Sequence, residues 1–316
     1  MLLNKNKEKN KEKRTLSSIE SKEIISFNTQ YLNMSPYVES TVVKISDNII
    51  KSNLTSKENR FLGEQYLLNY KTNNDYIGYK IGISNFIKQE AIATATNLEF
   101  NEDLEDIIKL PIHTKVKVAL STAIINRRSV RKFSGNSMHL KDLSNILYYS
   151  QGISAEVPAY GSMENKNLKL RNAPSAGGLY PIELYLYINN VKDLEDGIYR
   201  YYPYAHALKK VSGNMNEKEI RSLAEFAFIN AEKANVIVFY IYNLPINTRK
   251  YGDAGMAYAF IETGEIAQNL QLVSTALAYG ACDIGGYEKQ HVEELLGLDG
   301  VLKHMIHMTL VGVQEE

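Results

Sequence analysis

The sequence has very little cysteine, no long apolar run and no excess of either charge. Cys282 is the single cysteine among 316 residues, which excludes an intramolecular disulfide and a zinc cluster held by several thiolates. No stretch approaches the roughly 18 apolar residues that a membrane span requires, and no apolar segment follows the basic N-terminus as it would in a signal peptide. We therefore expect a cytoplasmic protein that does not span a membrane.

Positive and negative charges balance over the whole chain. The 36 Lys+Arg and 36 Asp+Glu give a formal net charge of +0. A nucleic-acid-binding domain is usually strongly basic, because neutralising phosphates supplies much of its affinity, so we expect no nucleic-acid partner. With 44% hydrophobic and 10% aromatic residues, the composition is that of a globular protein.

Local composition divides the chain into three parts. Residues 1–14 hold six lysines or arginines and two glutamates, so we expect residues 1–20 to form a disordered basic arm, with a tether for an acidic partner as the alternative. Residues 21–110 are polar and mixed, and we expect a small N-terminal subdomain that contacts a peptide or a partner. Residues 111–316 form the main predicted domain.

The main domain mixes helical and strand patterns. Apolar residues at helical spacing predict helices over residues 117–126, 140–149, 255–279 and 292–296, the second ended by Gly152 and the third by Gly280. Apolar and aromatic runs predict strands over residues 182–188, 197–202, 206–211, 236–242 and 304–313. We expect residues 154–171 to be a loop. The fold class is α+β, with long helices packed on a mainly antiparallel sheet.

Three guanidinium groups and a hydroxyl lie within five residues at the end of a predicted helix. They belong to Arg127, Arg128, Ser129 and Arg131. Forked N–H donors match the oxygens of a phosphate group. A solvated basic patch is the alternative interpretation.

Two glycine-containing turns would allow a ligand to approach the backbone closely. The first comprises Pro174, Ser175, Ala176 and Gly177, followed by a second glycine, with the Ser175 hydroxyl exposed. The second comprises Ile284, Gly285 and Gly286, between a long and a short predicted helix. Neither is a Walker loop or a dinucleotide fingerprint, and an ordinary turn is the alternative for each.

Lys250 and Tyr251 place an amine beside a phenol just before the predicted long helix. A neighbouring cation favours the phenolate, and partial burial lowers the pKa of a lysine, so we expect both pKa values to move towards neutrality. Such a pair can remove and relay a proton.

Metal binding and other catalytic groups have weaker support. His304 and His307 are three residues apart in a predicted strand, so we expect them on opposite faces and predict no metal site. Glu262 and Glu265 share a helix face and are expected to face solvent.

Taken in order, these elements resemble the nitroreductase superfamily and, within it, the SagB-type peptide (azoline) dehydrogenases of thiazole/oxazole-modified microcin biosynthesis, the streptolysin S-like type. The resemblance covers about residues 105–313 and rests on residues 127–133, 173–183, 197–201, 250–252 and 276–287. It implies a three-layer nitroreductase-like fold, an intertwined homodimer and bound FMN. The implied activity is oxidation of azoline rings to thiazoles or oxazoles in a ribosomally made precursor peptide, together with cyclodehydratase subunits.

The resemblance also implies roles for the residues above. Arg127, Arg128, Ser129 and Arg131 would hold the FMN phosphate and ribityl chain. Pro174, Ser175, Ala176 and Gly177 would reach the flavin ring from the other subunit, and Ile284, Gly285 and Gly286 would lie behind it. Lys250 and Tyr251 match the catalytic pair, with Tyr251 favoured as the base and the exchanged roles left open.

The sequence departs from the family pattern in one respect, and two other functions remain as alternatives. Many nitroreductases have a late Lys or Arg for the phosphate, whereas Lys303 is the only lysine or arginine after Lys289 here. An NAD(P)H-dependent reductase of small nitro compounds or quinones is the alternative enzyme. A non-catalytic scaffold subunit of a peptide-modification complex is the alternative without chemistry.

Overall fold

The computed structural model describes residues 105–158, 167–226 and 228–315, together with Gly63, Tyr66, Leu67, Lys80 and Ser84. The predicted basic arm and nearly all of the predicted N-terminal subdomain lie outside the described residues. Within the described part, no helix combines the length and the apolar character needed to cross a bilayer.

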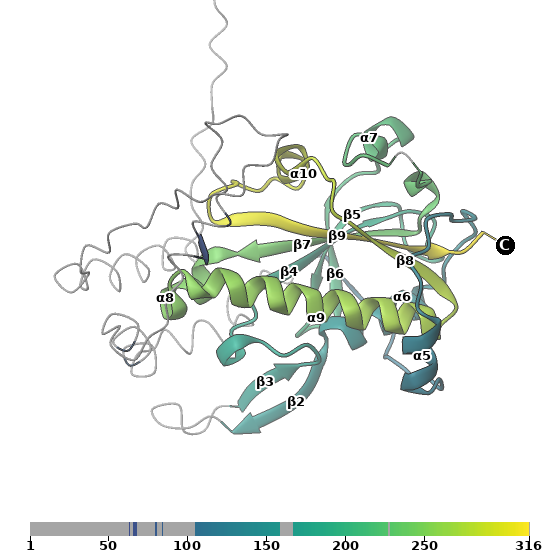
Figure 1. Cartoon of the computed structure of the whole chain (residues 1–316). Coiled ribbons are helices and arrows are strands. Elements are labelled where there is room, and N and C mark those ends of the chain that lie inside the picture. The colour runs from purple at the N-terminus through teal and green to yellow at the C-terminus, as the bar shows by residue number, and fades with distance from the viewer. Residues whose placement is uncertain are drawn as a thin grey trace, which may run out of the picture.

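A seven-stranded sheet forms the centre of the described chain (Figure 1). Its order is β1-β6-β5-β4-β7-β9-β8, and every neighbouring pair is antiparallel. The strands are β1 (Ile107–Lys109), β4 (Ile182–Ile188), β5 (Gly197–Tyr202), β6 (Ala207–Ser212), β7 (Val236–Asn243), β8 (Tyr279–Ile284) and β9 (Lys303–Val313). Each of the eight residues of β7 is buried, as expected for a continuously apolar strand between two neighbours and two covered faces.

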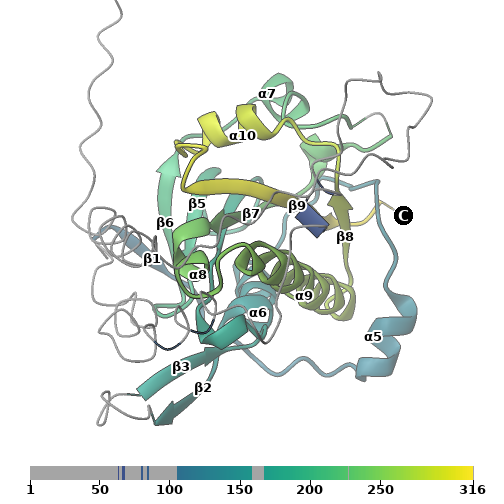
Figure 2. The same cartoon turned by 60° about the vertical axis from the view of Figure 1, so that its left-hand side comes forward.

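Helices cover both faces of this sheet (Figures 1 and 2). They are α5 (Leu120–Asn126), α6 (Leu140–Gln151), α7 (Glu217–Arg221), α8 (Leu244–Tyr251), α9 (Ala254–Ala276) and α10 (Lys289–Leu295). Apolar residues of α6 and α9 pack with one face of the sheet, and those of α7 and α10 pack with the other. The result has three layers and confirms the predicted α+β class.

The long helix α9 ends earlier than predicted. It stops at Ala276, and Ala278 adopts a positive φ of 64° that turns the chain into β8. Gly280 therefore lies inside a strand and does not end the helix. A Cβ at Gly280 would lie 2.6 Å from Val130 Cβ, so this glycine allows close packing of the preceding segment on β8.

The predicted loop over residues 154–171 is wrong at both ends. β2 (Ile153–Pro158) and β3 (Asn167–Arg171) form a separate antiparallel hairpin, visible below α9 in Figure 1. The hairpin pairs only with itself among the described strands, so little of its sequence needs to be apolar. Its mixed composition therefore gave no strand signal.

The prediction that His304 and His307 lie on opposite faces of the strand is also wrong. His304 pairs with Tyr242 and His307 with Tyr240, and the register shifts by one residue between them. Tyr240 and Tyr242 are two residues apart and share a face, so the two histidines share one as well. The described residues still contain no group of three metal-ligating side chains.

Candidate functional site

Lys250 and Tyr251 lie at the C-terminal end of a helix that the sequence analysis did not predict. α8 starts with Pro245 in its first turn and ends at Gly252, whose φ of 55° favours glycine. The predicted position just before the long helix is therefore correct, but the pair belongs to a short helix of its own. The turn at Gly252 leads directly into α9.

The Ser-Ala-Gly-Gly turn and the Lys-Tyr pair meet in space. Gly177 has a φ of 65°, and a Cβ added there would lie 2.5 Å from Lys250 Nζ and 2.5 Å from Tyr251 Oη. Two motifs about 75 residues apart thus form one corner, which we call the Gly177 corner (Gly177, Lys250 and Tyr251). A side chain at position 177 would therefore displace the ends of the Lys250 and Tyr251 side chains from these positions.

Burial disfavours the charged form of both side chains and therefore shifts their two pKa values in opposite directions. It lowers the pKa of Lys250 and, together with the neighbouring Tyr258, raises the pKa of Tyr251. Lys250 Nζ lies 5.0 Å from the centre of the Tyr251 ring, and the Tyr258 ring packs edge-on against Tyr251 with ring centres 5.1 Å apart. The expected lowering of the Tyr251 pKa is therefore wrong, whereas the expected lowering of the Lys250 pKa is confirmed.

Ser175 is not exposed to a ligand in the way that the sequence predicted. Its hydroxyl donates to Glu262 Oε2 at 2.5 Å and accepts the backbone N–H of Tyr180 at 2.9 Å. Glu262 is 3% exposed, so the expectation that it faces solvent is wrong. Ser175 therefore shapes the turn, whereas Pro174 and Gly177 are the exposed members of it.

The arginine cluster lies farther along α9. Arg127 donates to Gln271 Oε1 at 3.2 Å, and Arg128 donates to the backbone carbonyls of Ile125 and Arg127 at 2.7 and 2.8 Å. Arg131 makes a long contact of 3.3 Å with the carbonyl of Ser129. Arg128, Ser129 and Arg131 are exposed, so their remaining donors are available to an anion.

A polar network that the sequence analysis missed continues from Arg127 into the sheet. Gln271 Nε2 donates to Asp283 Oδ2 at 2.7 Å, and His307 Nε2 lies 3.2 Å from Asp283 Oδ1. Together with Phe260 these side chains line a groove of about 230 Å³ beside α9. No motif marks them, because each is a single polar residue in an otherwise ordinary helix or strand.

Gly285 and Gly286 follow β8 directly, and not a long helix as predicted. A Cβ at either position would meet no atom within 4 Å, so the space above this backbone is open. The side chain of Ile284 is buried in the core formed with α7 and α10. Its backbone, but not its side chain, can therefore contact a ligand on the exposed side.

Lys303 is engaged elsewhere and is not a free late cation. Its Nζ donates to Glu183 Oε2 at 3.0 Å, and Arg200 lies 3.5 Å from Glu183 Oε1. Burial alone would raise the pKa of Glu183, but these two cations hold it at about 2. Lys303 therefore pairs with a buried carboxylate that joins β4, β5 and β9.

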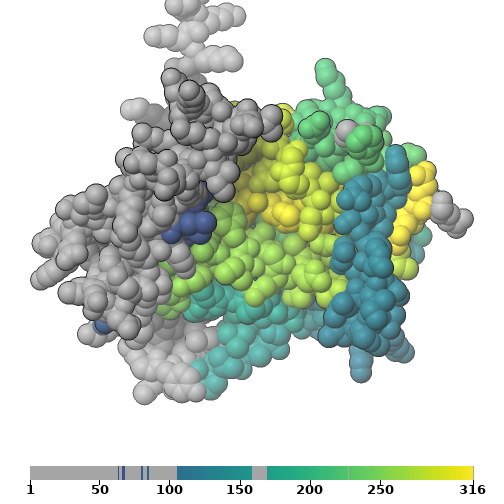
Figure 3. Space-filling model, viewed as in Figure 1, coloured from purple at the N-terminus to yellow at the C-terminus, as the bar shows by residue number. Residues whose placement is uncertain are grey.

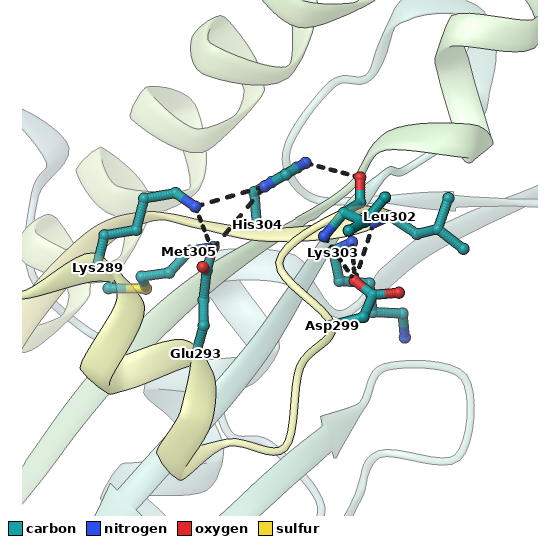
Figure 4. Close-up of polar contacts among 8 residues, drawn as sticks. Lys289, Glu293, Asp299, Leu302, Lys303, His304 and Met305 are labelled. Atoms are coloured by element: carbon teal, nitrogen blue, oxygen red, sulfur yellow. Dashed lines mark hydrogen bonds and ion pairs between the residues drawn. The ribbon is translucent and has the colours of Figure 1, made fainter. Parts of the chain in front are cut away.

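The start of β9 is fixed by two further acidic side chains. Asp299 Oδ1 accepts the backbone N–H groups of Leu302 and Lys303, and Glu293 contacts both Lys289 and His304 (Figure 4). The Lys289 Nζ to Glu293 Oε1 distance is 2.5 Å. These contacts are internal and hold the strand that carries Lys303 and His307.

The two predicted clusters are separated along α9. The Gly177 corner connects to the helix at Glu262 through Ser175, and the arginine cluster connects at Gln271. Nine residues of α-helix span about 14 Å at a rise of about 1.5 Å per residue. Within one chain, the helix contacts of the two clusters therefore lie about 14 Å apart along α9.

The N-terminal part of the chain also reaches this region. Tyr66 donates its hydroxyl to the backbone carbonyl of Asp253 at 2.7 Å. Asp253 is two residues after Tyr251. At least one residue of the predicted N-terminal subdomain therefore lies beside the α8–α9 junction.

Comparisons with known proteins agree on one family. The sequence profile of the nitroreductase family matches residues 124–313, more than half of the chain. A putative nitroreductase of Methanocaldococcus jannaschii, MJ1384, is 31% identical over 189 residues, which cover 60% of this chain and 88% of that protein. The microcin B17-processing protein McbC of Escherichia coli is 29% identical over 147 residues, or 45% of this chain and 54% of McbC.

A solved structure shows the same fold. The crystal structure of a putative nitroreductase from Anabaena variabilis superimposes with a TM-score of 0.52 at 24% identity. The match covers 66% of this chain and 41% of that one. This chain thus spans most of the archaeal protein but only about half of McbC and less of the Anabaena chain.

Proposed function

Because the chain belongs to the nitroreductase family, we propose that it is an FMN-dependent oxidoreductase that oxidises azoline rings in a ribosomally made precursor peptide. The observation that carries the proposal is the Gly177 corner, where a glycine turn meets a lysine of lowered pKa and a tyrosine. A base beside an open backbone suits the removal of a proton from a bound substrate.

The described residues fit FMN chemically. Arg127, Arg128, Ser129 and Arg131 supply a phosphate-binding donor set, because guanidinium groups bind phosphate through paired N–H donors. The open backbone at Gly285 and Gly286 can take a flat ring system without side-chain interference. Lys303 would not contribute, since Glu183 already binds it.

The peptide substrate is supported by the similarity to McbC, whose name describes processing of microcin B17. It is also supported by the Lys-Tyr pair, which the sequence shares with the SagB-type dehydrogenases. Oxidation of an azoline to an azole removes one proton and one hydride, and aromatisation provides the driving force. FMN, when bound, supplies the hydride acceptor.

In this proposal Lys250 removes the proton from the ring carbon. A lowered pKa leaves more of the amine neutral at physiological pH, as a base requires. Tyr251, which keeps its proton because burial raises its pKa, donates a hydrogen bond that orients the ring. The roles first favoured from the sequence are thereby exchanged.

We also propose a homodimer. Leu120, Ile124 and Ile125 of α5 and Phe260 and Ile261 of α9 are each about half exposed or more. The helix α5 lies at the C-terminal end of α9 (Figures 1 and 3). An apolar surface of this kind is typical of a subunit interface. Pairing two chains here would let the turn at residues 174–177 and the arginine cluster of different chains share one cofactor.

Cyclodehydratase subunits and the precursor peptide are the proposed partners, because azolines must first be formed from Cys, Ser or Thr. Residues 21–110 are the proposed contact for peptide or partner, in line with the position of Tyr66. An NAD(P)H-dependent nitro or quinone reductase would use the same fold and cofactor, and a scaffold subunit would need no cofactor.

Two measurements on the purified full chain separate these functions. We expect flavin absorbance that persists through gel filtration, and oxidation of a cyclised azoline peptide with oxygen as the final acceptor. A colourless protein that takes up no FMN would favour the scaffold. Turnover of a nitro compound with NADPH, and none of the cyclised peptide, would favour the small-molecule reductase.

A further inference from the structure

Glu262 is a buried carboxylic acid with no ion-pair partner among the described residues. It lies in the middle of α9, 3% exposed, with Oε2 accepting the Ser175 hydroxyl and Oε1 making no hydrogen bond. Burial raises its pKa to about 7, against the opposing effects of Ser175, Arg171 and the nearby backbone of Ile182. Burying an acid without an ion-pair partner costs folding free energy, and such residues are found preferentially at functional sites.

Ser175 connects this acid to the shape of the turn. Its hydroxyl accepts the N–H of Tyr180, and its backbone carbonyl accepts the N–H of Gly178 at 2.9 Å. Since the hydroxyl oxygen already accepts from Tyr180, its proton is directed to Glu262. Ser175 therefore closes the turn that contains Gly177 through both its hydroxyl and its backbone carbonyl, and Glu262 fixes the orientation of the hydroxyl.

The turn matters because of what Gly177 touches. Its backbone lies against Lys250 Nζ and Tyr251 Oη with no room for a methyl group. A shift of the turn by about an ångström would change the position of both polar groups. Misplacement of this size can cost about a hundredfold in rate.

The charged and titratable groups that face Glu262 come from three elements. Arg171, at the end of β3, lies between the rings of Tyr180 and Tyr204 at 4.7 and 4.9 Å and lowers the pKa of Glu262. Glu265, on α9, raises it, and Tyr180 lies in the turn itself. None of them forms an ion pair with the acid among the described residues.

We propose that Glu262 is a positioning residue that, through Ser175, holds the Gly177 turn against Lys250 and Tyr251 more firmly when it is ionised than when it is protonated. The inference rests on the proposed function for its catalytic meaning. Its physical basis is that a hydrogen bond to a carboxylate is roughly twice as strong as one to a neutral acceptor.

The test is hydrogen exchange of the segment 174–180 in the cofactor-free full chain, read by mass spectrometry at pH 6 and pH 8 and normalised to intrinsic exchange. We expect protection of this segment in the wild type to rise by about tenfold between the two pH values. Glu262→Gln keeps an acceptor for Ser175 but cannot ionise, so its protection should stay constant. Glu265→Gln, one turn away on the same helix, is the matched control: it should keep the rise in protection, displaced to lower pH because Glu265 raises the pKa of Glu262.

A second variant checks the path through Ser175. Ser175→Ala should give low, pH-independent protection, and adding Glu262→Gln should reduce it no further. Wild-type pH dependence in Glu262→Gln, or additive losses in the double variant, would overturn the proposal. Because exchange is measured without cofactor, these outcomes are independent of whether the chain binds FMN, which tests the proposed function separately.

Discussion

Gly177 and Gly178 have the same positive φ but different surroundings. Both have a φ of 65°, yet a Cβ at Gly177 would collide with Lys250 and Tyr251, whereas one at Gly178 would meet nothing within 4 Å. Strain from the left-handed conformation, roughly 1–2 kcal/mol, is common to both. Any additional loss in Gly177→Ala relative to Gly178→Ala therefore measures the effect of the new methyl group on Lys250 and Tyr251.

We expect Gly177→Ala to lower kcat/KM for azoline oxidation by about a hundredfold, because the methyl group displaces both polar groups. Gly178→Ala should lose only stability, about 1–2 kcal/mol, and keep activity within about threefold of the wild type. Steady-state kinetics and thermal unfolding of the two variants provide the comparison. Equal losses of activity would show that the turn does not act through Lys250 and Tyr251.

At this scale the sequence located the motif residues but not all of their surroundings. Residue type and spacing pointed to Arg127, Gly177 and Lys250 as candidates, and the family resemblance gave them their proposed roles. The sequence predicts a surface position for Glu262, which is wrong, because periodicity shows which residues share a helix face but not what covers that face. The proposed exchange of roles between Lys250 and Tyr251 rests on their burial, which only the folded chain reveals.

At the scale of elements, an ion pair joins β9 to β4 and β5, and its lysine is therefore not available to bind a phosphate group. Lys303 joins β9 to Glu183 of β4, with Arg200 of β5 as the second cation. Lys303→Met should lower the free energy of unfolding by about 3 kcal/mol, because a buried carboxylate loses one of its partners. The FMN dissociation constant of the folded variant should be unchanged.

Chemical denaturation and flavin fluorescence titration measure the two quantities separately. Arg131→Met is the matched comparison, since the Arg131 side chain is exposed and its one hydrogen bond within the described residues is to the carbonyl of Ser129. It should weaken FMN binding and leave stability nearly unchanged. The opposite pattern, weaker FMN binding by Lys303→Met at an unchanged free energy of unfolding, would indicate that Lys303 binds the phosphate.

The elements themselves were predicted unevenly, for physical reasons. Buried strands such as β4 and β7 have continuous apolar runs and were recognised within a residue of their bounds. The hairpin β2–β3 and the short helix α8 were not, because neither buries a continuous apolar face. The bulge in β9 was also missed, since one extra residue in a strand has no composition of its own.

At the scale of the whole molecule, the exposed apolar residues of α5 and α9 form the proposed dimer surface. Ile125→Glu places a charge where the second chain would pack, so we expect a monomer in sedimentation and a loss of bound FMN. Val301→Glu is the control, because Val301 is similarly exposed, 69% against 67%, but lies in the loop between α10 and β9. A dimer that survives Ile125→Glu with its FMN would contradict the proposed interface.

The central claim is that the Gly177 corner performs the proton removal of an azoline oxidation. The most direct measurement is the mass of a cyclised precursor peptide after incubation with the FMN-loaded wild type and with Lys250→Ala. We expect the wild-type reaction to remove two hydrogens from each azoline, and the variant to remove none while keeping its FMN. Equal mass loss in both proteins, or none with the FMN-loaded wild type, would contradict the claim.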